Sequence, residues 1–194
     1  MKKIKIILKA PILWILRLKP IYKLTKWLYL IARYEYCKKI SYGRNPKLDN
    51  VFSDLTVKNG PFKGMKYPDF VSCGSSIYPK LLGYYEPELD SIFETIINKQ
   101  YSEIIDIGCA EGYYAVGLAI KHKSAKVFAY DTNQTALVQC KKMATLNSVD
   151  DRIIIGNFFS DKDLENFNFT GNSLIICDCE GYENELFNKN NITN

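Results

Sequence analysis

The sequence predicts an α/β fold with a doubly wound, mostly parallel sheet. From residue 103 onward, short and almost wholly apolar segments alternate with segments of helical periodicity. That alternation is typical of parallel strands that are covered by helices on both faces. Before residue 41 the chain is basic and apolar, which predicts an amphipathic helical segment ahead of the domain. A chain of 194 residues is long enough for one domain with such an appendage.

The alternating part contains four predicted strands that share runs of Ile, Val, Leu and Phe: EIIDIG (103–108), AKVFAYD (125–131), RIIIGN (152–157) and SLIICDCE (173–180). Two predicted helices separate the first three strands: YYAVGLAIKH (113–122) and QTALVQCKKMATLN (134–147). A polar stretch precedes the fourth strand. We expect that strand to form an exposed apolar edge, so the sheet is predicted to be incomplete at the C-terminus, as in a truncated product.

Residues 41–100 are predicted to hold a hairpin-like element and a lead-in helix. Asn59, Gly60 and Pro61 lie between two β-prone runs, which is typical of a tight turn. The lead-in helix is expected from about Glu86, with Pro87 at its first position. Residues 84–86 precede this helix and are expected either near a site or, more often, in a structural role. The predicted division is therefore 1–40, 41–100 and 101–194.

The N-terminal segment holds most of the positive charge. Residues 1–40 contain eleven Lys or Arg and one acid, Glu35, whereas the whole chain has a formal charge of +5. The remaining residues are therefore net acidic, which argues against a nucleic-acid partner. Lys, Arg or Pro interrupts each apolar run before the length of a spanning helix. We expect either peripheral membrane contact through residues 1–40 or packing on protein, including a second copy in a homo-oligomer.

The six cysteines form no recognisable zinc motif, so we expect no metal site. Cys177 and Cys179 are predicted to lie on the same face of a strand, where geometry disfavours a mutual disulfide. Reduced thiols predict a cytoplasmic protein, either free or peripheral at the inner face of the membrane.

A glycine-containing turn after the first predicted strand indicates a cofactor site. Its pattern is Asp106-x-Gly108-x-Ala110-x-Gly112. A dinucleotide fingerprint would place glycines where the backbone meets a pyrophosphate, but a preceding acid repels that charge. The same acid favours a cofactor that carries an ammonium and a sulfonium. Asp131, which ends the second predicted strand, is placed to accept hydrogen bonds from ribose hydroxyls.

These motifs resemble the class I S-adenosylmethionine-dependent methyltransferases, which have a Rossmann-like fold. The string Asp178-x-Glu180-Gly181-x-Glu183, together with VFAYDTN in the second strand, resembles the FkbM-type methyltransferases. The resemblance covers roughly residues 80–188. It implies S-adenosylmethionine as the cofactor and an adenine contact from Asn157. The other cofactor-binding residues that it implies are Asp106, Gly108, Ala110, Glu111, Gly112 and Asp131.

Methyl transfer to a hydroxyl requires a group that takes the proton. Asp178 is the expected catalytic base and Glu180 the second choice, since both follow a strand's carboxyl end. The alternative is that these acids orient the cofactor or hold the loop. His122 is expected to be a surface residue. FkbM-type enzymes imply O-methylation of a sugar, glycan or lipid-linked acceptor. A truncated, non-catalytic Rossmann-like domain that binds only the cofactor or a partner is the alternative function.

Overall fold

The computed structural model describes Leu28 and residues 44–187. Residues 44–187 belong to one compact unit, Ser41–Asn194. The predicted membrane or packing role of residues 1–40 therefore falls on residues outside the described part, Leu28 excepted. Within the described part, no helix has the length and the apolar character needed to cross a bilayer.

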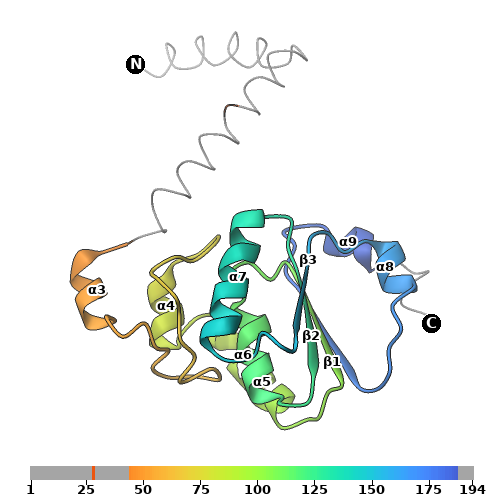
Figure 1. Cartoon of the computed structure of the whole chain (residues 1–194), viewed down its shortest axis with the longest axis horizontal. Helices are drawn as coiled ribbons and strands as arrows, with labels where there is room; N and C mark the ends of the chain where they lie inside the picture. The colour runs from red at the N-terminus through yellow and green to blue at the C-terminus, as the bar shows by residue number, and fades with distance from the viewer. Residues whose placement is uncertain (1–27, 29–43, 188–194) are drawn as a thin grey trace, which may run out of the picture. The chain divides into compact units, whose positions relative to one another are not determined.

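A four-stranded parallel sheet forms the centre of this unit (Figure 1). The strands are β1 (Glu103–Ile107), β2 (Lys126–Tyr130), β3 (Ile153–Gly156) and β4 (Ser173–Cys177). Their spatial order is β3-β2-β1-β4, so the two central strands are those with the most buried residues. In register, Ile105 lies opposite Phe128 on one side and Ile175 on the other. The predicted α/β class and parallel sheet are confirmed, and β4 is an edge strand among the described residues.

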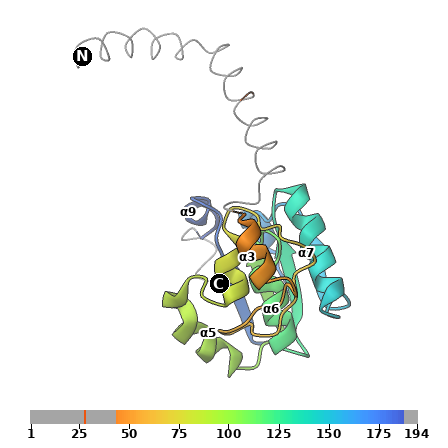
Figure 2. The same ribbon diagram turned by 90° about the vertical axis from the view of Figure 1, so that its left-hand side faces the viewer.

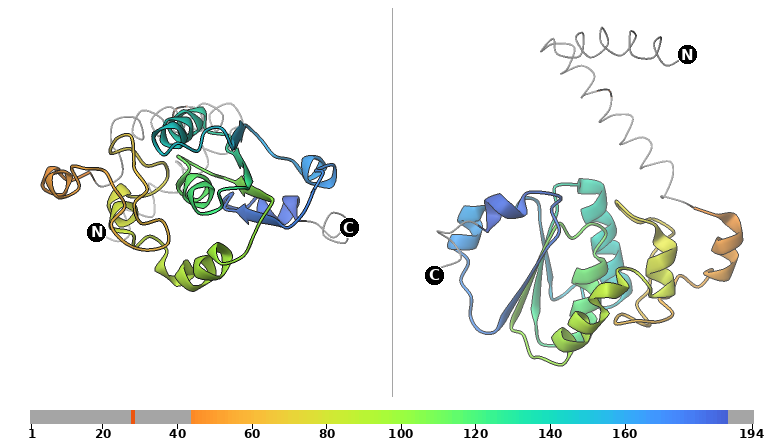
Figure 3. Two further views of the ribbon diagram at one scale, coloured as in Figure 1. Left: turned by 60° about the horizontal axis from the view of Figure 1, so that its bottom comes forward. Right: turned by 180° about the vertical axis from the view of Figure 1, so that it is seen from behind.

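Three helices cover one face of the sheet: α5 (Asp90–Ile97), α6 (Tyr113–Lys121) and α7 (Gln134–Leu146). The views of Figures 2 and 3 agree that α5 and α7 lie on either side of α6. Helix α5 follows a 3-10 turn, Pro87–Leu89, close to where the lead-in helix was predicted. Helix α7 begins after Asn133, whose side chain accepts hydrogen bonds from the N–H groups of Thr135 and Ala136.

The other face is covered by two short helices, α8 (Asp161–Glu165) and α9 (Glu183–Leu186) (Figure 1). Helix α8 lies in the stretch that was expected only to be polar. A capping box explains it: the Ser160 hydroxyl accepts from the Asp163 N–H, and the Asp163 carboxylate accepts from the Ser160 N–H. Leu164 then buries itself against the sheet, which supplies the tertiary contact that such a short helix needs.

The segment before α5 contains the expected hairpin-like element and two helices that were not predicted, α3 (Pro46–Val51) and α4 (Ile77–Leu82). Backbone pairing joins the hairpin arms, with the Val57 N–H donating to the Met65 carbonyl at 2.9 Å. At the turn, the Phe62 ring packs directly on α6 at Gly117. A Cβ at that glycine would lie only 2.5 Å from the ring, so a side chain there would displace Phe62. The hairpin thus belongs to the same core as the helical face of the sheet.

Alternate residues of β1 divide the core into two parts. Ile104 packs in the large cluster with α5, α6 and α7. Ile105 and Ile107 pack in the smaller cluster with α8 and α9. This is the alternation that a strand imposes on successive side chains. Both faces of β1 are therefore buried, so the loop that follows β1 starts from a strand that is fixed by packing on both sides.

The prediction that His122 is a surface residue was wrong. His122 is only 3% exposed and packs edge-on against the Tyr101 ring, with centroids 5.4 Å apart. Its Nε2 has no hydrogen-bond partner among the described residues. The Arg152 guanidinium donates to the carbonyls of Ala119 and His122, at 2.8 and 2.9 Å, so the end of α6 is held inward rather than exposed. Burial lowers the pKa of His122.

The buried His122 predicts a pH-dependent stability. Because its folded pKa lies below the ordinary value near 6.5, its stabilising contribution is complete above that pH and is lost as the pH falls. We expect the stability advantage of the wild type over His122→Gln to shrink between about pH 8 and about pH 5. Urea unfolding of both proteins across that range measures it. A stability difference between the two proteins that is constant with pH would contradict a lowered pKa of His122.

Candidate cofactor site

The loop between β1 and α6 passes close to the end of β4. Gly108 has φ of 86°, and its N–H donates to the Tyr130 carbonyl at 2.8 Å. A Cβ at position 108 would lie 2.0 Å from the carbonyl oxygen of Asp178. Only glycine fits there, because both the left-handed backbone and the close approach exclude a side chain. The loop therefore brings the carboxyl ends of β1 and β4 together, where ligands of such sheets bind.

Asp131 ties the same loop to the end of β2. Its Oδ2 accepts a hydrogen bond from the Ala110 N–H at 2.8 Å, and its Oδ1 accepts from the Asn133 N–H at 2.7 Å. A carboxylate has about four lone-pair positions, so both oxygens keep acceptor capacity. Asp131 thus shapes the loop and can also accept hydrogen bonds from a ligand's hydroxyl groups.

Asp106 is a buried carboxyl group within β1 and is only 2% exposed. Its Oδ2 has no hydrogen-bond partner among the described residues. Burial raises its pKa to about 7, and the nearby charges of Asp131 and Asp178 act in the same direction. A cationic ligand group would offset both the burial and the repulsion, whereas a pyrophosphate would increase the repulsion. The surroundings of Asp106 therefore fit a cofactor that carries positive charge.

The three acids after β4 lie in different environments. The carboxylate of Glu183 accepts from the N–H groups of Cys179 and Gly181, at 2.6 and 2.7 Å, and so holds the loop. Asp178 and Glu180 are exposed. Partial burial raises the pKa of Asp178, with Glu86 and Glu180 adding repulsion. The loop-holding role considered in the sequence analysis is thus filled by Glu183, which leaves Asp178 and Glu180 available to a ligand.

Glu111, which the resemblance places among the cofactor residues, is 1% exposed and is held by the protein itself. Lys80 forms an ion pair with its Oε1 at 2.6 Å, and the Ser72 hydroxyl donates to the same oxygen at 2.8 Å. The Cys73 N–H donates to its Oε2 at 2.8 Å. The ammonium of Lys80 also lies 4.7 Å from the centre of the Tyr85 ring. These contacts give Glu111 a structural role in fixing the loop.

Lys80 was not predicted as a site residue, because a single lysine in a short apolar run does not indicate a buried ion pair. Residues 84–86 were expected mainly to have a structural role. In the structure Glu86 has φ of 50° and accepts a hydrogen bond from the Tyr114 hydroxyl. It also raises the pKa of Asp178 by repulsion, second to burial, so its carboxylate lies near that of Asp178. Asn157 is exposed after β3 and accepts a hydrogen bond from the Gln134 side chain.

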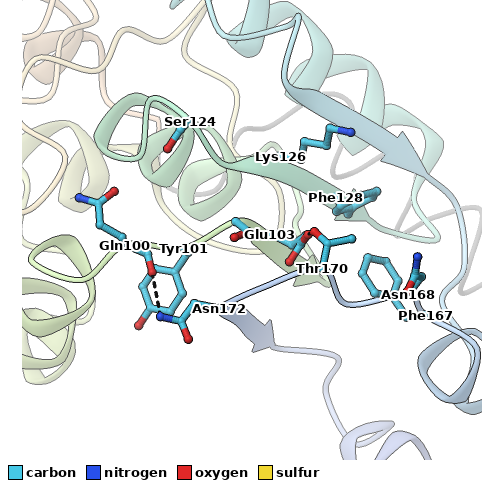
Figure 4. Close-up of a pocket in the computed structure, with 11 residues that line it drawn as sticks. Gln100, Tyr101, Glu103, Ser124, Lys126, Phe128, Phe167, Asn168, Thr170 and Asn172 are labelled. Atoms are coloured by element: carbon cyan, nitrogen blue, oxygen red, sulfur yellow. Dashed lines mark hydrogen bonds between the residues drawn. The ribbon is translucent and has the colours of Figure 1, made fainter.

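A pocket of about 580 Å³ lies elsewhere, at the amino ends of the strands (Figure 4). Phe128 and Phe167 form its apolar part, with ring centres 5.1 Å apart. Glu103 at its edge already accepts hydrogen bonds from the hydroxyls of Thr170 and Ser173, and these bonds lower its pKa. Because ligands of parallel sheets bind at the carboxyl ends, this pocket is separate from the cofactor site.

Comparison with known proteins agrees with the geometry. Residues 90–172 match the family described as the methyltransferase small domain. The release factor glutamine methyltransferase of Flavobacterium psychrophilum is 35% identical over 85 residues. That alignment covers 40% of this chain and only 30% of the relative's length.

Solved structures of methyltransferases are also similar to this chain. An RNA methyltransferase from Salinibacter ruber, in complex with S-adenosyl-L-homocysteine, is 18% identical with a TM-score of 0.34, covering 38% of this chain and 48% of its own. A methyltransferase from Thiobacillus denitrificans is 12% identical with a TM-score of 0.41, covering 72% and 45%. Both scores are low, so the assignment rests on the sequence matches. Those matches support a class I S-adenosylmethionine-dependent methyltransferase domain over residues 90–172.

The buried ion pair of Lys80 and Glu111 predicts that removing the lysine alone destabilises the protein more than removing both charges. Lys80→Met leaves the charge of Glu111 buried without its cation, so we expect a loss of about 3–5 kcal/mol in the free energy of unfolding. Adding Glu111→Gln removes that charge and should recover most of the loss. Urea unfolding of the two variants and the wild type tests this. A double variant no more stable than Lys80→Met would contradict the pairing.

The buried Asp106 predicts that the free energy of unfolding depends on pH. Its folded pKa of about 7 exceeds the ordinary 3.8, so the stability supplied by its protonated form is present below pH 3.8 and lost as the pH rises through 7. At about 1.4 kcal/mol per tenfold change in proton affinity, this shift is worth about 4 kcal/mol. We expect Asp106→Asn to gain stability over the wild type at pH 8 and to lose that gain near pH 4. Denaturant unfolding at the two pH values measures it, and an equal difference at both would contradict it.

Proposed function

We propose that this chain is an S-adenosylmethionine-dependent methyltransferase that acts on a hydroxyl group of a sugar, glycan or lipid-linked acceptor. The observation that carries the proposal is the buried carboxyl of Asp106, whose Oδ2 has no hydrogen-bond partner among the described residues, beside a glycine loop that closes on β4. That arrangement admits a cationic cofactor and disfavours a pyrophosphate. The family match over residues 90–172 supports the same class.

The residues that would hold the cofactor are those of the β1 loop and the end of β2. Asp106 faces its positive charge, Gly108 allows close approach of the backbone, and Asp131 accepts from ribose hydroxyls. Gly112 belongs to the same loop and lets it pack on α7, because a Cβ there would lie 2.7 Å from the Cys140 Sγ. Ala110 belongs to the same loop, with φ of 48°, and Asn157 is proposed to approach the adenine. Glu111 acts through the loop, because its carboxylate is taken up by Lys80 and its neighbours.

S-adenosylmethionine supplies a methyl group on a sulfonium, which is an electrophile. The protein's part is to place an acceptor oxygen in line and to take its proton. Asp178 is the proposed base, since it is exposed at the end of β4 and its raised pKa strengthens it as a proton acceptor. Glu180 and Glu86 contribute through their repulsion of Asp178. Glu180 remains the second choice for the base.

The acceptor class rests on the signature at residues 178–183, which resembles that of the FkbM-type enzymes. The glutamine methyltransferase relative favours a second candidate, transfer to an amide nitrogen of a protein. A third candidate is a domain that binds the cofactor without turnover. Peripheral membrane contact and self-association through residues 1–40 remain predictions.

Calorimetric titration of S-adenosylmethionine into the purified chain tests the cofactor. Asp131→Ala removes the proposed ribose acceptor and should weaken binding by at least tenfold, about 1.4 kcal/mol. The control is Asp150→Ala, which removes an exposed acid from a turn far along the chain from the loop. Absence of binding by the folded wild type would contradict the proposal.

Transfer of labelled methyl groups distinguishes the acceptors. Sugar, glycan and lipid-linked hydroxyl acceptors are compared with a peptide that presents glutamine. With a hydroxyl acceptor, Asp178→Asn should lower turnover by about 100-fold or more while cofactor affinity is kept. Labelling of the glutamine peptide alone would move the function to the second candidate. Normal turnover in Asp178→Asn would remove Asp178 as the base.

A further inference from the structure

A second group of polar side chains lies where β4 ends, on the face of the sheet that carries α8 and α9. Cys177, Cys179 and Glu183 each offer a donor atom there, and these atoms all lie within 4.8 Å of one another. The two Sγ atoms are 3.6 Å apart, and both cysteines are free thiols. The proposed methyl transfer uses neither sulfur.

We propose that Cys177, Cys179 and Glu183 form a binding site for a thiophilic divalent cation of the zinc class. Zinc binds thiolate sulfur at about 2.3 Å in tetrahedral geometry, which separates two sulfur ligands by about 3.8 Å. The observed 3.6 Å matches this separation without rearrangement. Two sulfurs and one carboxylate make three protein ligands, so the fourth position is left to water.

The carboxylate is already oriented for this role. Glu183 Oε1 accepts from the Cys179 N–H at 2.6 Å, and Oε2 accepts from the Gly181 N–H at 2.7 Å. Each oxygen keeps a further lone pair, so a cation can be bound without breaking either bond. Ligating carboxylates are commonly fixed by such outer hydrogen bonds.

The ligand set selects the kind of cation. Two thiolates favour soft and borderline metals such as zinc, whereas magnesium and calcium prefer oxygen ligands alone. Each thiol must give up its proton to coordinate, so binding releases two protons to solvent for every cation taken up. A disulfide is the competing chemistry of two neighbouring thiols. The two sulfur atoms are 3.6 Å apart, well beyond the roughly 2.05 Å of a disulfide bond, and two positions on the same face of one strand disfavour that bond.

The site lies next to the cofactor loop. The Cys179 thiol is 3.4 Å from the Ile107 carbonyl and 3.4 Å from the position that a Cβ would take at Gly108. Coordination turns this thiol from a hydrogen-bond donor into a thiolate, so its contact with Ile107 changes. Because the proposal concerns this chain's own thiols, it does not depend on the methyl acceptor or on turnover.

Cobalt(II) is the probe, since it takes zinc's place in tetrahedral thiolate sites and gives visible and near-ultraviolet absorption. The full chain is reduced with a phosphine, freed of metal with a chelator, and titrated with cobalt and then zinc. We expect one cobalt per chain, a thiolate-to-cobalt charge-transfer band, two protons released, and displacement by zinc. A reduced, folded chain that shows no such band overturns the proposal without any variant.

Variants assign the ligands. Cys177→Ser and Cys179→Ser should each abolish the charge-transfer band or weaken cobalt binding at least tenfold, and Glu183→Gln should weaken it while both sulfurs remain. Cys73→Ser is the matched control, because it removes a partly exposed thiol outside the cluster and should leave the band unchanged. Circular dichroism shows whether each variant is folded. A band that persists in the folded double variant of Cys177 and Cys179 overturns the assignment.

Discussion

The buried ion pair between Lys80 and Glu111 joins the two halves of the described structure. Lys80 belongs to α4, in the segment that precedes the sheet, whereas Glu111 belongs to the loop after β1. Their 2.6 Å contact, together with the bonds from Ser72 and Cys73, fixes the loop at Glu111. Asp131 fixes it at the preceding residue through the Ala110 N–H. The loop that is proposed to meet the cofactor is therefore positioned before any ligand arrives.

This constraint explains why charge is tolerated around the loop. A buried carboxylate is costly unless it is paired, and Glu111 is paired on both oxygens. Asp106, a few residues earlier, is buried without such a partner for its Oδ2. The two acids thus have opposite roles. Glu111 stabilises the loop, whereas Asp106 keeps a buried carboxyl oxygen without a hydrogen-bond partner in the candidate site. Stability given up at Asp106 is typical of positions that are shaped by ligand binding rather than by folding.

Much of the fold followed from short-range patterns. The four strands are runs of apolar residues bounded by Gly, Asp or Asn, so each was predictable within a few residues. Helix α7 has an apolar face and α6 is apolar along most of its length, so both were predictable as well. Helices α3, α4 and α8 were not predicted, because they have only five or six residues and depend on caps and tertiary contacts. His122 was misplaced for a similar reason. Its burial comes from Arg152 and Tyr101, which are distant in sequence.

The site was predictable where a motif fixes the backbone, as at Gly108 and Asp131. It was not predictable where a side chain arrives from another segment. Lys80 and Glu86 reach the loop only through the packing of residues 72–86 against α6, which no local pattern encodes. The proposed cation site at Cys177, Cys179 and Glu183 was predictable only in part, since the two cysteines were expected to share one face of a strand. The orientation of Glu183 toward it depends on the turn that begins α9.

Arg152 has a consequence for how the molecule opens. Its guanidinium binds the carbonyls of Ala119 and His122 at the end of α6, and the Arg152 carbonyl itself accepts from the Val127 N–H in β2. A helix end usually frays first, but this one is fastened to the neighbouring strands by a single side chain. Amide protons near the end of α6 should therefore exchange with solvent only in the larger openings of the core. Local opening would then be concentrated around α8, α9 and the edge strand β4, the side of the sheet that carries Cys177 and Cys179.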